Sequence, residues 1–276
     1  MLTLLEGRST LQKRIFSSFV LIAGTAAAAA VDWICGLAVT FIVAMGLREF
    51  FGMLEKKGLK IYKRFGMLVG AVIPLSIMLR FELTRGWELF FLAAGLLTLI
   101  ILQFSRRDNS GAIVDISVTI FGIIYIAWFL SFLIKIRYMD GGLRLIAMLL
   151  LIAKGGDIGA YLLGSRFGRT PLLPRISPRK SVEGAAGGLL FSVAAGVISG
   201  VLFKLPLTLA HLFFLGVSLG ILAQLGDLSE SLVKRDCQVK DSGNFFPGMG
   251  GILDVVDSLI FTAPVFYFYL TFNTYR

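Results

Sequence analysis

Two pairs of acidic residues, each pair three positions apart, stand at the ends of strongly apolar stretches in the last fifth of the chain. Asp227 and Glu230 close one apolar run, and Asp254 and Asp257 open the next. Residues three apart share one face of a helix, and carboxylates near a helix N-terminus are favoured by the macrodipole. Two such pairs on adjoining helices could converge on a hard cation such as Mg²⁺, which takes oxygen ligands. Solvated helix ends or interhelical ion pairs are the alternative for each acid.

Basic residues follow these acids closely in the sequence. Lys234 comes one helical turn after Glu230, Arg235 is next to it, and Lys240 and Asp241 stand shortly before a glycine-rich turn. Cationic groups beside a metal suit a polyphosphate substrate, because Lys and Arg bind the oxygens that the metal leaves uncovered. The pattern predicts a site for a metal and a phosphate at the membrane surface. The alternative is that these loops are basic only to set the membrane topology.

Two further candidate elements lie upstream. Asp157 falls within an apolar run, and an ionisable residue at membrane depth is a candidate site residue; an ion pair with Lys154 would explain it equally well. Ser177 followed by Pro178 is typical of a helix start, with Ser as the N-cap and Pro at the first helical position. Basic residues up to Lys180 would then favour an anion at that helix end. We therefore expect a second anion-binding element here.

The composition is that of an integral membrane protein. Hydrophobic residues make up 57% and charged residues 16% of the 276 residues, whereas about a quarter of a soluble domain is charged. Apolar runs of about 17 to 25 residues, the length that crosses a bilayer, recur along the chain. We expect an all-α, polytopic integral membrane protein with about nine transmembrane helices. Their expected bounds are about 15–31, 33–45, 65–79, 89–104, 116–134, 143–163 (interrupted at 154–157), 185–203, 207–230 and 252–272.

These helices are expected to form one continuous bundle, with a scaffold region at residues 1–140 and a catalytic region at residues 141–276. Lys and Arg concentrate at the N-terminus and in the loops after the second, fourth, sixth and eighth expected spans, which the positive-inside rule assigns to the cytoplasm. The multi-pass chain would then lie in the cell (inner) membrane with its site facing the cytoplasm. The net charge of +10 is explained by these loops, so no nucleic-acid partner is expected. Glycine pairs four apart predict close helix contact and make a homodimer reasonable.

The segment from Ser231 to Ser258 carries the longest motif. It reads Ser-Leu-Val-Lys-Arg, four residues, Lys-Asp-Ser-Gly, and then Phe-Pro-Gly-Met-Gly-Gly-Ile-Leu-Asp-Val-Val-Asp-Ser. This motif resembles the signature of phosphatidate cytidylyltransferases, the integral-membrane CDP-diacylglycerol synthases. Upstream, Asp157-Ile-Gly-Ala-Tyr and Ser177-Pro-x-Lys-Ser are also similar to that family. Together these motifs cover about the last 120 residues of the chain.

The resemblance implies a nucleotidyl transfer in phospholipid biosynthesis, in which CTP and phosphatidic acid give CDP-diacylglycerol and pyrophosphate. It implies Mg²⁺ as the cofactor, with K⁺ as a candidate second cation, and membrane lipids as partners. The implied metal ligands are Asp227, Asp254 and Asp257, with Asp241 in their neighbourhood; the implied binders of CTP or the phosphatidate headgroup are Lys234, Arg235 and Lys240; the residues implied on the nucleotide side are Asp157, Ser177, Lys180, Ser231, Gly250 and Gly251.

Two positions depart from the family pattern: Met249 stands where the family usually has His, and Val255 where it usually has Arg. We still expect an active enzyme, because the paired acids and the Lys-Arg-x4-Lys-Asp core are kept. Two other functions stay open at this point. One is an ion-coupled transporter that uses Asp157 and the interrupted sixth span as a midplane site. The other is a CTP-dependent lipid kinase that phosphorylates a lipid alcohol.

Overall fold

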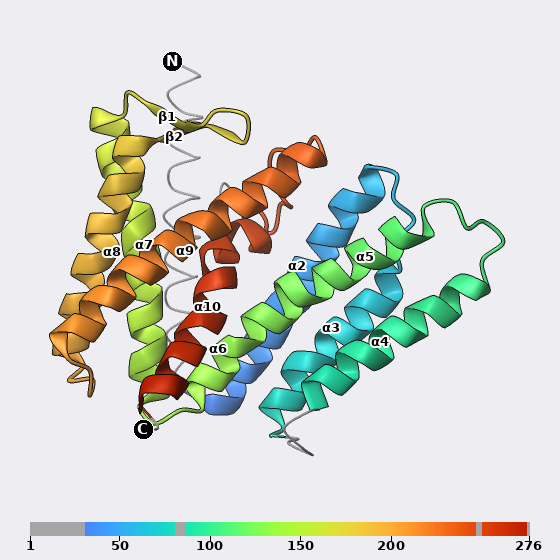
Figure 1. Ribbon diagram of the computed structural model, residues 1–276, viewed down its shortest axis with the longest axis horizontal. Helices are drawn as coiled ribbons and strands as arrows, with labels where there is room; N and C mark the ends of the chain where they lie inside the picture. Colours follow the sequence, from blue (N-terminus) through green and yellow to red (C-terminus); the bar gives the residue numbers. More distant parts are fainter. Residues whose placement is uncertain (1–30, 81–86, 247–249, 275–276) are drawn as a thin grey trace. The chain divides into compact units, whose positions relative to one another are not determined.

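The computed structural model describes residues 31–80, 87–246 and 250–274, and within them the chain is almost entirely helical, as predicted (Figure 1). Most of the first expected span and the position of Met249 lie outside the described residues. The elements are α2 (Asp32–Lys56), α3 (Lys63–Met78), α4 (Trp87–Phe104), α5 (Ala112–Gly122), the π-helix η1 (Ile123–Trp128), α6 (Phe129–Arg137), α7 (Gly142–Phe167), β1 (Pro171–Leu173), β2 (Ser177–Ser181), α8 (Val182–Leu202), α9 (Leu209–Asp236) and α10 (Ile252–Thr274).

Six helices in the described part of the chain are long and apolar enough to cross a membrane. They are α2, the continuous helix formed by α5, η1 and α6, and then α7, α8, α9 and α10. Helices α3 and α4 overlap the expected spans 65–79 and 89–104 and are not among these six. The chain is therefore a multi-pass membrane protein, and the count of about nine spans stays a prediction.

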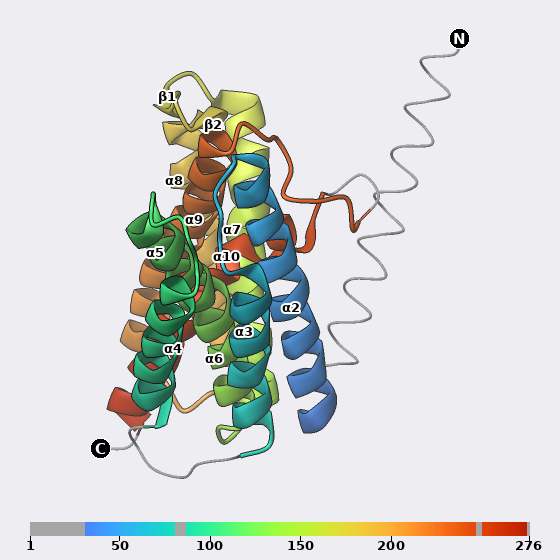
Figure 2. The ribbon, with the colours of Figure 1, turned by 90° about the vertical axis from the view of Figure 1, so that its right-hand side faces the viewer.

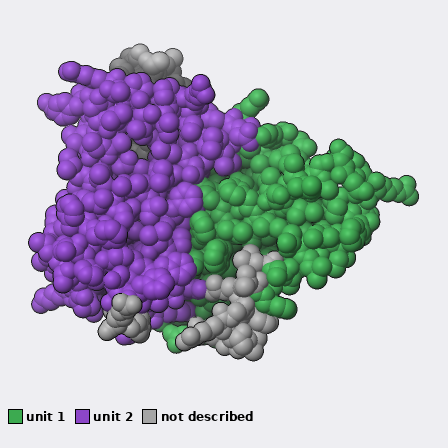
Figure 3. Space-filling model, viewed as in Figure 1, with its two compact units in different colours: residues 1–134, 237–253 green, residues 135–236, 254–276 purple. Residues whose placement is uncertain are grey.

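The chain divides into two compact units, which Figure 3 distinguishes by colour. Unit 1 consists of residues 1–134 and 237–253, and unit 2 consists of residues 135–236 and 254–276. The division expected at residue 140, within one continuous bundle, stays a prediction.

In unit 1, α2 packs against α3, and both contact the long helix that contains η1 (Figure 2). The expected end of the second span at residue 45 is wrong, because α2 continues to Lys56. The extension keeps an apolar face at helical spacing, and its buried side chains are Leu47, Phe50, Phe51, Met53 and Leu54. Glu49 therefore lies within α2, beyond the expected end of the second span.

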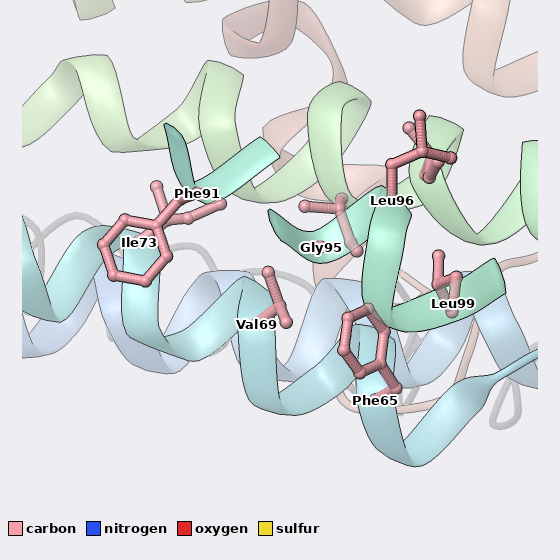
Figure 4. Close-up of a pocket in the computed structure, with 9 residues that line it drawn as sticks. Phe65, Val69, Ile73, Phe91, Gly95, Leu96 and Leu99 are labelled. Carbon is pink, nitrogen blue, oxygen red and sulfur yellow. The ribbon is translucent and has the colours of Figure 1, made fainter. Parts of the chain in front are cut away.

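An apolar cleft also lies in unit 1, where α4 packs over α3 and the following helix (Figure 4). Phe65, Val69 and Ile73 of α3 face Phe91 and Leu99 of α4 across it. Its lining is almost entirely carbon, so it offers no group that could bind a phosphate or transfer a proton.

In unit 2, α7 packs closely along α8, and α8 along α9 (Figure 1). Glycines permit this approach: a Cβ on Gly188 would lie 3.0 Å from the carbonyl oxygen of Gly156, and a Cβ on Gly216 would lie 2.6 Å from the Cα of Val193. The close helix contacts expected from glycine pairs are thus present. The expected interruption at 154–157 is wrong, since α7 is continuous from Gly142 to Phe167.

The helix start expected at Ser177 is also wrong. Residues Ser177–Ser181 form strand β2, which pairs with β1 in an antiparallel hairpin. Helix α8 begins only at Val182, where the side chain of Ser181 accepts a hydrogen bond from Gly184 N at 3.1 Å. Ser181 is therefore the N-cap of α8, and the Ser177-Pro178 pair four residues earlier does not start a helix.

Glu183, in the first turn of α8, explains why the later start is preferred. Its carboxylate accepts hydrogen bonds from the backbone nitrogens of Arg169 and Thr170, at 3.1 and 3.2 Å. These bonds hold the entry to β1 against the start of α8, so the hairpin is closed at its base. As a result Lys180 lies on a strand and not in the first turn of a helix.

Candidate functional site

Lys234 connects the two acid pairs that the sequence places at the ends of α9 and α10. Its ammonium lies 2.6 Å from Asp254 Oδ1 on α10 and forms an ion pair with Glu230, one turn earlier on α9. The side chain of Glu230 is 0% exposed, that of Asp254 is 9% exposed and that of Lys234 is 14% exposed. Because the three groups are removed from water, separating them would leave an uncompensated buried charge.

A second lysine approaches the same helix from the hairpin. Lys180 on β2 places its ammonium 2.6 Å from Asp227 Oδ2 on α9, and both side chains are about one-third exposed or less. Asp227 and Glu230 are three apart on α9, as the sequence spacing indicates. Lys180 thus contacts Asp227 from strand β2, although the helix start expected at Ser177 is not formed.

A third lysine, on α7, reaches α10. Lys154 donates hydrogen bonds to Asp157 Oδ2 at 3.0 Å and to Ser258 Oγ at 2.9 Å. The neighbouring Asp257 is buried, and its Oδ1 accepts a 2.6 Å hydrogen bond from Ser258 N. Lys154 is also close enough to Asp257 and Asp227 to interact with both electrostatically. Lys154 therefore contacts Asp157 directly and interacts with Asp227 and Asp257 only through the electrostatic field.

These three groups of contacts lie within unit 2 and interact with one another electrostatically, and we call them together the ionic cluster. Its members are Lys154, Asp157, Lys180, Asp227, Glu230, Lys234, Asp254 and Asp257. Its five acids outnumber its three lysines, so the cluster carries more negative than positive groups when all are ionised. A low-dielectric environment penalises such an imbalance, and a cation or bound protons would relieve it.

The donor chemistry of the ionic cluster fits a hard cation such as Mg²⁺, because its acids supply only oxygen ligands. The positions of these acids fit a metal ion less well than their chemistry does. The ammonium groups of Lys180 and Lys234 lie against Asp227 and Asp254, and in the described part of the chain no three His, Cys, Asp or Glu side chains are gathered to hold a metal ion. A metal ion would compete with these two lysines for the same carboxylate oxygens.

The remaining expected residues of unit 2 lie around the hairpin and on α9. Arg235 is exposed, and its Nε donates to the backbone oxygen of Ile176 at 3.2 Å. Ser177 follows Ile176 at the start of β2 and is half-buried. Ser231 is half-buried on α9, directly after Glu230. Arg235 thus fixes the end of α9 to the same hairpin that carries Lys180.

The expected residues between the two helices belong to unit 1. Lys240 and Asp241 are exposed. Gly250 has a φ of +103°, which favours glycine, and its backbone pairs with Phe246. Gly251 is buried against Ser242, so the glycine-rich turn is closely packed in its described part.

Sequence reasoning missed Glu49, which contacts the same segment. Its carboxylate accepts hydrogen bonds from Ser242 Oγ and from the backbone nitrogens of Ile252 and Leu253, the first two residues of α10. The rule that flagged Asp157, an ionisable residue in an apolar helix, could have flagged Glu49 as well. The expected end of the second span at residue 45 leaves Glu49 outside the span, so the rule does not cover it. Val255, a departure from the family pattern, lies half-buried on α10.

A family model and several named relatives indicate the family of this chain. The model of the cytidylyltransferase family matches residues 12–273. A phosphatidate cytidylyltransferase of Synechocystis sp. is 33% identical over 86% of this chain and 88% of its own length. The phosphatidate cytidylyltransferase of Bacillus subtilis is 35% identical over 83% of this chain and 87% of its own. YnbB, an uncharacterized protein of Escherichia coli, is 36% identical over 74% of this chain and 70% of its own.

Proposed function

We propose a reaction for this chain from one premise: it belongs to the cytidylyltransferase family and is a nucleotidyltransferase enzyme of phospholipid synthesis. The proposed reaction converts CTP and phosphatidic acid into CDP-diacylglycerol and pyrophosphate, in line with the names of its relatives. The observation that supports this reaction best is the ionic cluster, in which partly buried lysines and an excess of acids come together on apolar helices and the hairpin.

The proposed reaction depends mainly on compensation of the negative charge of its two substrates. A phosphate oxygen of phosphatidic acid forms a bond to the α-phosphorus of CTP, and the bond from that phosphorus to pyrophosphate breaks. The attacking oxygen is already anionic near neutral pH, so no strong general base is needed. The barrier comes from repulsion between two anions and from charge that builds up around the phosphorus. Cationic groups fixed in advance lower both contributions.

The lysines of the ionic cluster are fixed in this way. Lys234 is bound to two acids, Lys154 to Asp157 and Ser258, and Lys180 to Asp227. Because each ammonium is already oriented, little rearrangement is required when phosphate oxygens approach. We propose that Lys180 and Lys234 bind phosphate oxygens of the substrates, and that the acids hold these lysines in place before the substrates arrive.

Mg²⁺ is part of the proposal. Asp227, Asp254 and Asp257 would hold it, and it would neutralise charge on the triphosphate when bound. K⁺ stays a candidate second cation. The fit rests on the excess of carboxylates, and the competing contacts of Lys180 and Lys234 make it testable, since a bound metal must change those contacts.

Further assignments extend the proposal to the outer residues. Exposed Arg235 and Lys240 would bind CTP or the phosphatidate headgroup, with Asp241 in the metal's neighbourhood. Asp157, Ser177, Ser231, Gly250 and Gly251 would complete the nucleotide side. We also propose that the site faces the cytoplasm of the cell (inner) membrane, where CTP is found, that lipid enters from the inner leaflet, and that the chain forms a homodimer.

The test is an assay of purified protein with CTP and phosphatidic acid in mixed micelles. Label from the α-phosphate of CTP should enter the lipid while pyrophosphate is released, and the reaction should stop with a chelator and resume with Mg²⁺. In a parallel assay with a lipid alcohol in place of phosphatidic acid, label that enters the lipid from the γ-phosphate of CTP would instead indicate the lipid kinase. Absence of any turnover would contradict the proposal and leave transport as the alternative. Continuous α7 already removes the interrupted helix on which the transporter hypothesis relied.

A further inference from the structure

Glu49 holds two separate points of the segment that leads into α10. Its Oε2 accepts hydrogen bonds from Ser242 Oγ and Leu253 N, both at 2.9 Å, and its Oε1 accepts one from Ile252 N, also at 2.9 Å. Glu49 and these partners all belong to unit 1. One carboxylate on α2 therefore binds both Ser242, in the segment between α9 and α10, and the first two residues of α10, about two hundred positions later in the chain.

The segment is shaped to receive this carboxylate. A Cβ on Gly243 would lie 2.5 Å from Glu49 Oε1, and a Cβ on Gly251 would lie 2.4 Å from Glu49 Oε2. Real Cβ atoms do not approach an oxygen so closely, so any other residue at either position would displace the carboxylate or the backbone. Glycine at both positions is thus required for the observed contacts.

The contacts also fit the electrostatics of a helix start. The first backbone N–H groups of a helix have no partner within the helix, and a negative charge beside them is favoured by the macrodipole. A residue just before the helix usually supplies the acceptor. Here a residue of another helix supplies it, so the point at which α10 begins is fixed by α2.

We propose that Glu49 is a positioning residue for nucleotidyl transfer. It does not touch the reacting atoms; it fixes Ser242, which follows Lys240 and Asp241, and it fixes the first turn of α10, in which Asp254 comes directly after Leu253. This inference rests on the proposed function, because the residues that it positions are the ones assigned there to metal and phosphate.

The experiment compares Glu49→Gln with Glu55→Gln in purified protein. Glu55 lies on the same helix, and its carboxylate forms an exposed ion pair with Lys63. Glu49→Gln should lower kcat by about tenfold to a hundredfold, the usual cost of a small misplacement of reacting groups, and should leave the KM for phosphatidic acid unchanged. Glu55→Gln should keep the wild-type kcat. Hydrogen exchange in the peptide that contains Ile252 and Leu253 should be faster in Glu49→Gln and unchanged in the control.

A second variant keeps the test decisive if Glu49→Gln does not fold. Ser242→Ala removes one of the three donors and should lower kcat by about twofold to tenfold. Folded variants with wild-type kcat would overturn the inference, even if they unfold at a lower temperature, because a merely structural contact would change stability alone. An inactive wild-type protein would instead contradict the proposed function, and the role of Glu49 would be withdrawn with it.

Discussion

The ion pairs of the two units differ in burial and in balance. In unit 1, Lys60 pairs with Asp108, and both side chains are more than half exposed. In unit 2, Lys234 faces two acids, and all three side chains are nearly or fully buried. Exposed pairs contribute little to stability because water and salt screen them. Buried ionic groups can often be replaced by apolar ones without loss of stability, so the group of Lys234, Glu230 and Asp254 is better explained by function than by folding.

One pair in unit 1 resembles the cluster in burial but not in balance. Asp115 is buried, and Arg106 lies 3.2 Å from its Oδ2 while its guanidinium covers the ring of Tyr62. Here one base meets one acid, and the pair ties the loop after α4 to α5. It shows what a structural ion pair looks like in this protein, and it supplies matched controls for the cluster.

The largest effect is expected from Asp254→Asn. The substitution leaves Lys234 with Glu230 alone and removes a proposed metal ligand, so kcat should fall by roughly a hundredfold to a thousandfold without unfolding the protein. The measurement is the α-label assay on purified variants. Asp115→Asn is the control, which should lower the unfolding temperature but keep the turnover of the folded enzyme. Wild-type-like turnover in Asp254→Asn would remove the metal assignment.

A smaller effect is expected from Lys154→Met, which keeps the length of the apolar side chain but removes the ammonium. Asp157 and Ser258 then lose their shared donor, and the acids around Lys154 repel one another without compensation. We expect about a tenfold loss of kcat, in the range found for charge-assisted hydrogen bonds. Lys60→Met, in the exposed pair of unit 1, should have wild-type kcat. Equal losses in the two variants would mean that membership of the ionic cluster does not distinguish Lys154 from an exposed surface lysine.

The local part of this arrangement could be predicted from the sequence. Residues 227, 230 and 234 share one face of α9 because helical spacing requires it, and the ion pair between Lys234 and Glu230 follows. The position of Lys180 could not be predicted in the same way. Two serines compete to cap α8, and the hydrogen bonds of Glu183 to the entry of β1, which decide between them, exist only in the folded hairpin.

Contacts between distant segments were beyond the sequence altogether. Glu49 and Ile252 are 203 positions apart, and no spacing rule relates them. Hydropathy also does not indicate that Glu49 lies within a helix, because the charged pair Arg48 and Glu49 suggests the end of a membrane span. The buried side chains that follow, such as Phe50 and Phe51, carry the helix on to Lys56. The apolar face with helical spacing in residues 47–54 could have predicted that α2 continues beyond Glu49.

Glu230→Gln should change stability more than turnover. The amide keeps the shape of the fully buried side chain but no longer neutralises Lys234, which retains only Asp254. We expect a loss of about 1–3 kcal/mol in the free energy of unfolding and a severalfold loss of kcat. Thermal unfolding in detergent and the α-label assay measure the two effects. Unchanged stability would show that the excess of acids, and not the contact between Glu230 and Lys234, dominates the energetics of the cluster.

The smallest effect is expected from Asp108→Asn in unit 1. The hydrogen bond from Lys60 lowers the pKa of the Asp108 carboxyl, and the same bond raises the pKa of Lys60. A carboxyl with a lowered pKa adds stability above its unfolded pKa, near pH 4, and loses it as the pH falls through the folded pKa. Both groups are in water, so screening should leave this contribution too small to see. Wild type and Asp108→Asn should therefore unfold at the same temperature at pH 7 and differ no more at pH 3. A clear drop for Asp108→Asn at pH 7, matched to the drop for Glu230→Gln, would show that exposed and buried pairs contribute alike, and the contrast between the units would no longer point to function.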